Sequence, residues 1–150
     1  MILYRIARCQ YVNDLSGTGA RLYGGRWSSI GKPVVYLASS SSLAVLEVLV
    51  HLQPLLIPDG YCRMEMKVPD DKILSVKTDE LPDNWRDISP PQTLTRFGDR
   101  FIKEGKYLLL KVPSSIVPSE YNYLLNPAHP EMNKVKLLTR EPFDFDSRLV

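Results

Sequence analysis

Alternation of apolar and polar residues is the main pattern along this chain, and it predicts several short strands. In residues 60–68 (GYCRMEMKV), the side chains of Cys62, Met64, Met66 and Val68 alternate with more polar ones. One face of this strand is therefore expected to be buried. Further strands are predicted at residues 2–8, 33–38, 72–76, 106–112, 121–125 and 134–140.

Two segments have helical character. Residues 39–52 begin with serines that can cap a helix and are apolar on nearly every side, which predicts a core helix. Residues 90–105 have proline at their entry and glycine at their exit, as helices often do. Twelve prolines divide the second half of the chain into short elements without marking a second domain. The pattern indicates one α+β domain over residues 1–150.

Composition narrows the possible functions. With 19 basic and 17 acidic residues the net charge is +2, too small to predict a nucleic-acid-binding stripe. No segment reaches the length of a membrane span, and the first residues suit a strand better than a signal peptide, so a cytoplasmic location is expected. Cys9 and Cys62 have no metal-ligand spacing and are predicted to be buried free thiols.

The segment GARLYGGRWS, residues 19–28, combines three glycines with two arginines and two aromatic residues. One interpretation is an ordinary surface loop with exposed arginines. The other is a ligand-clamping loop, because glycine lets the backbone approach a ligand closely and arginine binds phosphates or carboxylates through paired hydrogen bonds. Arg26 is the candidate clamp.

Glu47 is an acidic residue in the otherwise apolar part of the first predicted helix. It lies among leucines and valines, so its carboxylate is expected to be partly desolvated. It could pair with an arginine or with His51, one turn further on, in a structural network. Alternatively, it could stabilise developing positive charge or bind a sugar hydroxyl in a cleft.

A third polar cluster lies in VPSEYNYLLNPAHPE, residues 117–131, where Ser119, Asn122, Asn126 and His129 are interleaved with apolar residues and prolines. The stretch fits either a series of ordinary turns or a rigid polar loop. The GxSxG motif of many serine hydrolases is absent, which disfavours that class.

Together these clusters resemble the RES-domain family, the toxins of RES-Xre toxin–antitoxin pairs. The resemblance covers YRIAR near the start, GARLYGGRWSSIGKPVVYLASSSSLAVLEVLVHL in the first third and VPSEYNYLLNPAHPE near the end. The family is named for an arginine, a glutamate and a serine. On the quoted motifs these correspond to Arg26, Glu47 and Ser119.

The resemblance implies a single domain with a central mixed sheet and flanking helices, similar to ADP-ribosyltransferase toxins. It also implies that NAD is the substrate, cleaved by hydrolysis or phosphorolysis, or used to transfer ADP-ribose to a protein. Arg26 would then bind the diphosphate, and Glu47 would offset the oxocarbenium-like charge. Tyr36 would stack on nicotinamide, and Ser119 would contact the ribose or the acceptor. Arg5 and Asn126 are further substrate-binding candidates.

The resemblance further implies an Xre-type helix-turn-helix antitoxin and a toxin dimer in the complex. Neither a metal nor a cofactor beyond the substrate NAD is expected, and DNA contact is expected from the antitoxin alone. Arg26, Tyr36, Glu47 and Ser119 are predicted to converge on one concave pocket. Two other classes stay open: a nucleotide-binding module without catalysis, and an interaction protein in which Arg26 and Glu47 form a buried ion pair.

Overall fold

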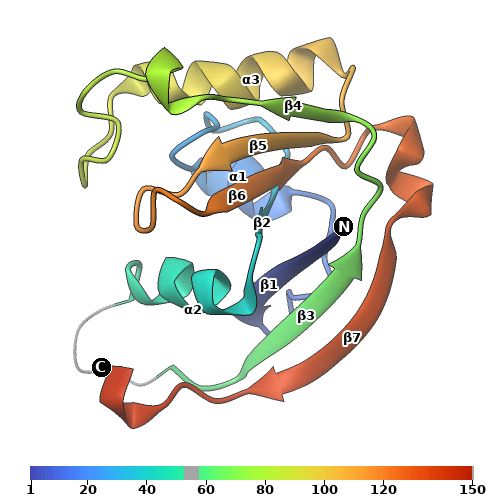
Figure 1. Cartoon of the computed structure of the whole chain (residues 1–150). Helices are drawn as coiled ribbons and strands as arrows, with labels where there is room; N and C mark the ends of the chain where they lie inside the picture. The colour runs from blue at the N-terminus through green and yellow to red at the C-terminus, as the bar shows by residue number, and fades with distance from the viewer. Residues whose placement is uncertain (53–57, 150) are drawn as a thin grey trace.

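The computed structural model describes residues 1–52 and 58–149, which contain one seven-stranded sheet of order β4-β5-β6-β2-β1-β3-β7. Strands β4 and β5 are parallel and the other neighbours are antiparallel, so the sheet is mixed, as expected. Figure 1 shows the sheet strongly bent, with β4, β5 and β6 on one side of β2 and β1, β3 and β7 on the other. The strands are β1 (Ile2–Arg8), β2 (Val35–Ala38), β3 (Tyr61–Lys67), β4 (Ile73–Ser75), β5 (Leu109–Pro113), β6 (Tyr121–Leu125) and β7 (Lys136–Phe143).

In the described part of the chain, three α-helices flank the sheet: α1 (Thr18–Tyr23), α2 (Ser41–Leu49) and α3 (Thr95–Glu104). Helix α2 packs against β1 and β2, whereas α3 lies along the β4–β5 side of the molecule (Figure 1). Among the described residues, no helix is both long enough and apolar enough to cross a membrane. The predicted α+β fold is confirmed.

The core consists of three apolar clusters that lie on both faces of the bent sheet. The predicted alternation in β3 is confirmed, because Cys62, Met64 and Met66 are buried in the first cluster together with Val68. The second cluster joins α3 to β5 and β6 around Trp27 and Trp85, and the third joins α2 to β1. The two tryptophans link the glycine-rich segment to residues far along the chain.

All seven predicted strands are present, with bounds that differ by a few residues at their ends. Both predicted helices are present as well, although shorter than expected. The short helix α1 was missed, because the segment was expected to be a loop. The six residues of α1 are too few to show a periodic pattern of apolar positions. The helix begins after Gly17, whose φ of 75° is a left-handed conformation that glycine adopts readily.

Helix α2 is less buried than the expected core helix. Only Leu43 and Ala44 are buried along it, whereas Leu46 and the following Val50 are exposed. One side of the helix packs on the sheet, and the other side is open beside the site described below. The apolar composition indicated helix correctly, but it could not tell which side the sheet would cover.

The prediction of free thiols is wrong, because Cys9 and Cys62 form a disulfide across 53 positions. Cys62 pairs with Ala7 in the register of β1 and β3. Cys9 directly follows β1 and continues this pairing beside the start of β3, where its amide donates to the carbonyl oxygen of Gly60 at 2.8 Å. The pairing depends on strand register, which the spacing of the two cysteines does not reveal.

Gly98 allows α3 to touch the main chain of the glycine-rich segment. Its amide donates to the carbonyl oxygen of Trp27 at 3.0 Å, and a Cβ at this position would lie only 2.0 Å from the same oxygen. We expect Gly98→Ala to lower the free energy of unfolding by about 1–3 kcal/mol, even though alanine favours helix over glycine by about 1 kcal/mol. Urea denaturation measures the change.

Gly19→Ala is the matched control, because Gly19 also lies in a helix and a Cβ there would meet nothing within 4 Å. This variant should be as stable as the parent or slightly more stable. Equal stability of Gly98→Ala and the parent would contradict the close contact between α3 and Trp27.

Candidate active site

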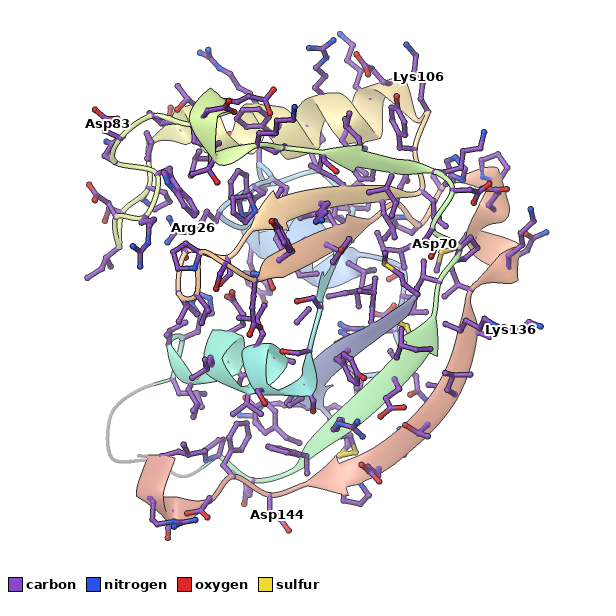
Figure 2. The ribbon with its side chains drawn as sticks, in the orientation of Figure 1. Arg26, Asp70, Asp83, Lys106, Lys136 and Asp144 are labelled. Atoms are coloured by element: carbon purple, nitrogen blue, oxygen red, sulfur yellow. A yellow bond between two sulfur atoms is a disulfide. The ribbon has the colours of Figure 1, made fainter. Side chains whose placement is uncertain are left out.

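Arg26 lies in a tight turn directly after α1, where the amide of Gly25 donates to the carbonyl oxygen of Ser28 at 2.9 Å. The half-buried guanidinium donates through one terminal nitrogen to the carbonyl oxygens of Trp85 at 2.8 Å and Asp87 at 3.0 Å. Figure 2 shows Arg26 on the same side of the molecule as Asp83, which lies in the same connection as these two acceptors. The turn therefore holds a charged side chain against a distant part of the chain.

Tyr36 supports this turn from β2. Its hydroxyl accepts the amide of Trp27 at 3.2 Å and shares a hydrogen bond with Ser28 Oγ at 2.9 Å. Burial raises the pKa of the Tyr36 phenol, so the hydroxyl stays protonated at neutral pH. Gly25 is required for this contact, because a Cβ there would lie 2.6 Å from the hydroxyl. One of the three glycines in the GARLYGGRWS segment thus makes room for Tyr36.

Glu47 projects from the last turn of α2, a helix capped by Ser40 Oγ, which accepts the amide of Leu43 at 3.1 Å. The Oε1 atom of Glu47 accepts hydrogen bonds from Ser114 Oγ at 3.0 Å and from Asn122 Nδ2. Among the described residues, no hydrogen bond to the second oxygen, Oε2, is present. The half-buried carboxylate is therefore fixed through one oxygen, and the other can meet a ligand.

Ser114, at the end of β5, is fully buried, with 0% of its surface exposed. Its hydroxyl oxygen accepts the amides of Ile116 and Val117, each at 3.1 Å. Because a hydroxyl has one proton and two lone pairs, these bonds direct the proton towards Glu47. Sequence reasoning missed Ser114 as a site residue.

The charges of Arg26 and Glu47 lie near each other without an ion pair between them. Burial lowers the pKa of Arg26, whereas the nearby charges of Glu47 and Asp87 raise it. The guanidinium stays charged at any physiological pH. None of the ion pairs in the described part of the chain joins Arg26 to Glu47. The interpretation in which these two residues form a buried ion pair therefore lacks its central contact.

The structure brings Arg26, Tyr36 and Glu47 to one region but leaves other candidates outside it. Ser119 is exposed in the β5–β6 loop, and the serine that contacts Glu47 is Ser114 instead. Asn126 lies four residues beyond Asn122, about 13 Å further in the strand direction. Its side chain accepts the amide of Ala128 at 3.0 Å and thereby stabilises a local turn.

Arg5 lies on the opposite face of the sheet. Its neighbours on β1, Tyr4 and Ile6, pack in the cluster that contains α2, so strand alternation turns Arg5 away from that helix. The Arg5 guanidinium donates to the carbonyl oxygens of Val12 at 3.0 Å and Asp14 at 2.6 Å. Arg5 thus holds the turn after β1 and does not join Arg26 and Glu47.

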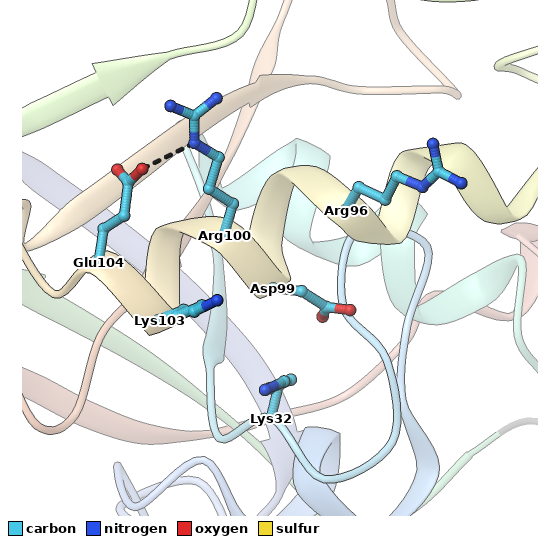
Figure 3. A pocket seen from close by; sticks show the side chains of 6 residues that line it. All are labelled: Lys32, Arg96, Asp99, Arg100, Lys103 and Glu104. Carbon is cyan, nitrogen blue, oxygen red and sulfur yellow. Dashed lines mark hydrogen bonds and ion pairs between the residues drawn. The ribbon is translucent and has the colours of Figure 1, made fainter.

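Two surface hollows lie away from this cluster. The larger, of about 630 Å³, lies between α3 and Lys32 and is lined by charged residues such as Arg96 and Lys103 (Figure 3). The other lies between α3 and β4. Neither is lined by Arg26, Tyr36 or Glu47, so the concave pocket expected around these residues is not one of them. No group of three or more potential metal ligands is present among the described residues.

The sequence model described as "RES domain" matches residues 2–146. This chain belongs to the RES domain family. This chain is 42% identical over 152 residues to the protein named Toxin Res of Photorhabdus laumondii, and the match covers 100% of this chain and 97% of the relative. It is 37% identical over 147 residues to the Prs ADP-ribosylating toxin of a Sphingobium species, covering 96% and 91% of the two chains.

A solved structure shares the fold of this RES domain. A chain from the crystal structure of the M. tuberculosis MbcT–MbcA toxin–antitoxin complex matches it with a TM-score of 0.78 and 19% sequence identity. The match covers 95% of this chain and 84% of the other. This likeness shows the fold, whereas the family model and the named relatives confirm the family inferred from the sequence motifs.

Proposed function

We propose that this RES domain is the toxin of a toxin–antitoxin pair and cleaves NAD at the bond between nicotinamide and ribose. The observation that carries the proposal is the arrangement of Glu47, which is fixed through Oε1 by Ser114 and Asn122 while the cationic Arg26 lies near it without an ion pair. A carboxylate and a guanidinium held apart in this way suit a substrate with an incipient cation at one end and a diphosphate at the other.

Cleavage of NAD proceeds through an oxocarbenium-like ribose, as in other glycosyl transfers. The bond between the ribose carbon and the nicotinamide nitrogen breaks, and its electron pair leaves with nicotinamide. The free oxygen of Glu47 binds a ribose hydroxyl and offsets the developing positive charge. Arg26 binds the diphosphate through donors that Trp85 and Asp87 do not use. An acceptor oxygen then bonds to the ribose carbon and loses its proton.

Three acceptors fit this chemistry: water, inorganic phosphate and a protein side chain. The name of the Sphingobium relative, an ADP-ribosylating toxin, favours a protein acceptor as the second candidate function. The test is to incubate the purified protein with NAD alone, with phosphate, and with a cell extract, and to identify the products by mass. Free ADP-ribose, its 1″-phosphate and a protein adduct identify the three acceptors. Absence of nicotinamide release in all three mixtures would contradict the proposal.

Ser114→Ala tests how Glu47 is oriented. Loss of a hydrogen bond to a charged group costs about 1–2 kcal/mol, so we expect nicotinamide release to fall about 5- to 30-fold. Ser119→Ala, made in parallel, decides which serine serves the site, because Ser119 is exposed in the same loop. A larger loss for Ser119→Ala than for Ser114→Ala would restore the role first inferred for Ser119.

The partner of this toxin is an Xre-type antitoxin that carries the DNA-binding part and covers the region around Arg26. The solved toxin–antitoxin complex supports an antitoxin partner, and the net charge of +2 supports the absence of direct DNA contact. The toxin is also expected to form a dimer within the complex and to act in the cytoplasm. Tight, salt-sensitive DNA binding by this chain alone would contradict the assignment.

A further inference from the structure

Residues 82–88 carry the two carbonyl oxygens that hold Arg26. The segment is anchored by Trp85, which is buried and whose ring centre lies 6.3 Å from that of Trp27. The carbonyl oxygens of Trp85 and Asp87 both accept hydrogen bonds from Arg26. The orientation of the guanidinium therefore depends on the position of this segment.

Arg86, between these two acceptors, makes a contact of its own. Its Nε donates to the carbonyl oxygen of Ser115 at 2.9 Å, in the loop that follows β5. The preceding residue, Ser114, holds Glu47 through its hydroxyl. One arginine thus joins the segment that orients Arg26 to the loop that orients Glu47.

We propose that Arg86 is a positioning residue of the NAD-cleaving site. It fixes the separation between the guanidinium of Arg26 and the carboxylate of Glu47 by linking the two segments that carry their hydrogen-bond partners. The proposal rests on the proposed function for its catalytic part. The structural part, that Arg86 holds the loop of Ser114 in place, does not depend on NAD.

The exposure of Arg86 separates a positioning role from a general structural one. A hydrogen bond made at the surface contributes little to the stability of the whole fold, because water competes for both partners. A misplacement of reacting groups by a fraction of an ångström, in contrast, lowers turnover. Loss of Arg86 should therefore affect the local order of the loop and the reaction rate, while the unfolding midpoint stays close to that of the parent.

Amide hydrogen exchange tests the structural part without substrate. The amides of Ile116 and Val117 donate to Ser114 Oγ, so their exchange rates report on the position of that hydroxyl. In Arg86→Ala we expect these two amides to exchange about 3- to 10-fold faster, the range for loss of one exposed hydrogen bond. Arg96→Ala, which removes an exposed arginine of α3, is the control and should leave both rates unchanged. Unchanged exchange in Arg86→Ala would overturn the proposal.

Steady-state kinetics test the catalytic part. Nicotinamide release by Arg86→Ala should be about 3- to 10-fold slower than by the parent, and the combined variant with Ser114→Ala should lose less than the product of the two single effects. Independent, multiplicative effects, or parental turnover despite faster exchange, would overturn the positioning role. If the parent itself releases no nicotinamide, the proposed function fails, whereas the exchange experiment still decides whether Arg86 holds the loop.

Discussion

Glu47→Gln is expected to lower the turnover of NAD by about 10²- to 10³-fold, the range for removal of one electrostatic contact to a transition state. The structure shows that this substitution can keep the hydrogen bonds of Glu47 while it removes the charge. Ser114 and Asn122 both donate to Oε1, so the amide oxygen of glutamine will take that place and its NH₂ group will replace Oε2. The side chain keeps its shape and its protein contacts, but the atom that meets the substrate becomes an uncharged donor.

The loss should appear in kcat more than in NAD affinity, because the charge of Glu47 matters most when the ribose becomes cationic. Nicotinamide release over time gives the rate, and calorimetry gives the affinity. Glu120→Gln is the matched control, because Glu120 is a carboxylate on the β5–β6 loop that also accepts a serine hydroxyl, from Ser40 Oγ at 3.1 Å. A folded Glu47→Gln variant with parental turnover would remove Glu47 from the mechanism and return it to a structural role.

Arg26→Ala is expected to weaken NAD binding by about 2–4 kcal/mol, because a charged, partly buried donor to the diphosphate is lost. The effect should differ in kind from that of Glu47→Gln. Removal of a diphosphate contact affects the bound substrate and the transition state alike, so the change appears largely in affinity. Measurement in the Glu47→Gln background keeps NAD intact during the calorimetric titration.

Two controls accompany this experiment. Arg21→Ala removes an exposed arginine from α1, and it should leave NAD affinity unchanged. Urea denaturation must show that Arg26→Ala is folded, because the carbonyl groups of Trp85 and Asp87 lose their donor in this variant. NAD affinity equal to that of the Glu47→Gln parent would exclude Arg26 from substrate binding.

Local sequence patterns were enough to predict several elements of this fold and its family. The alternation in residues 60–68 was enough to identify β3 and its buried face, because the period of two is a property of each strand by itself. The helix around Glu47 was recognised from its serine caps and its apolar composition, which are also local, and Glu47 is half-buried as expected. The order of the motifs along the chain was enough to identify the family.

Contacts between distant segments were decided only by the tertiary structure. Ser114 and Ser119 lie in the same proline-rich turn, and the path of the loop after β5 determines that Ser114 faces Glu47. The register of β1 and β3 determines that Cys9 meets Cys62. Sequence spacing does not encode these outcomes, because strand order, register and loop closure are set by the packing of the whole chain. For the same reason, the link from Arg86 through Ser115 towards Glu47 became visible only in the folded molecule.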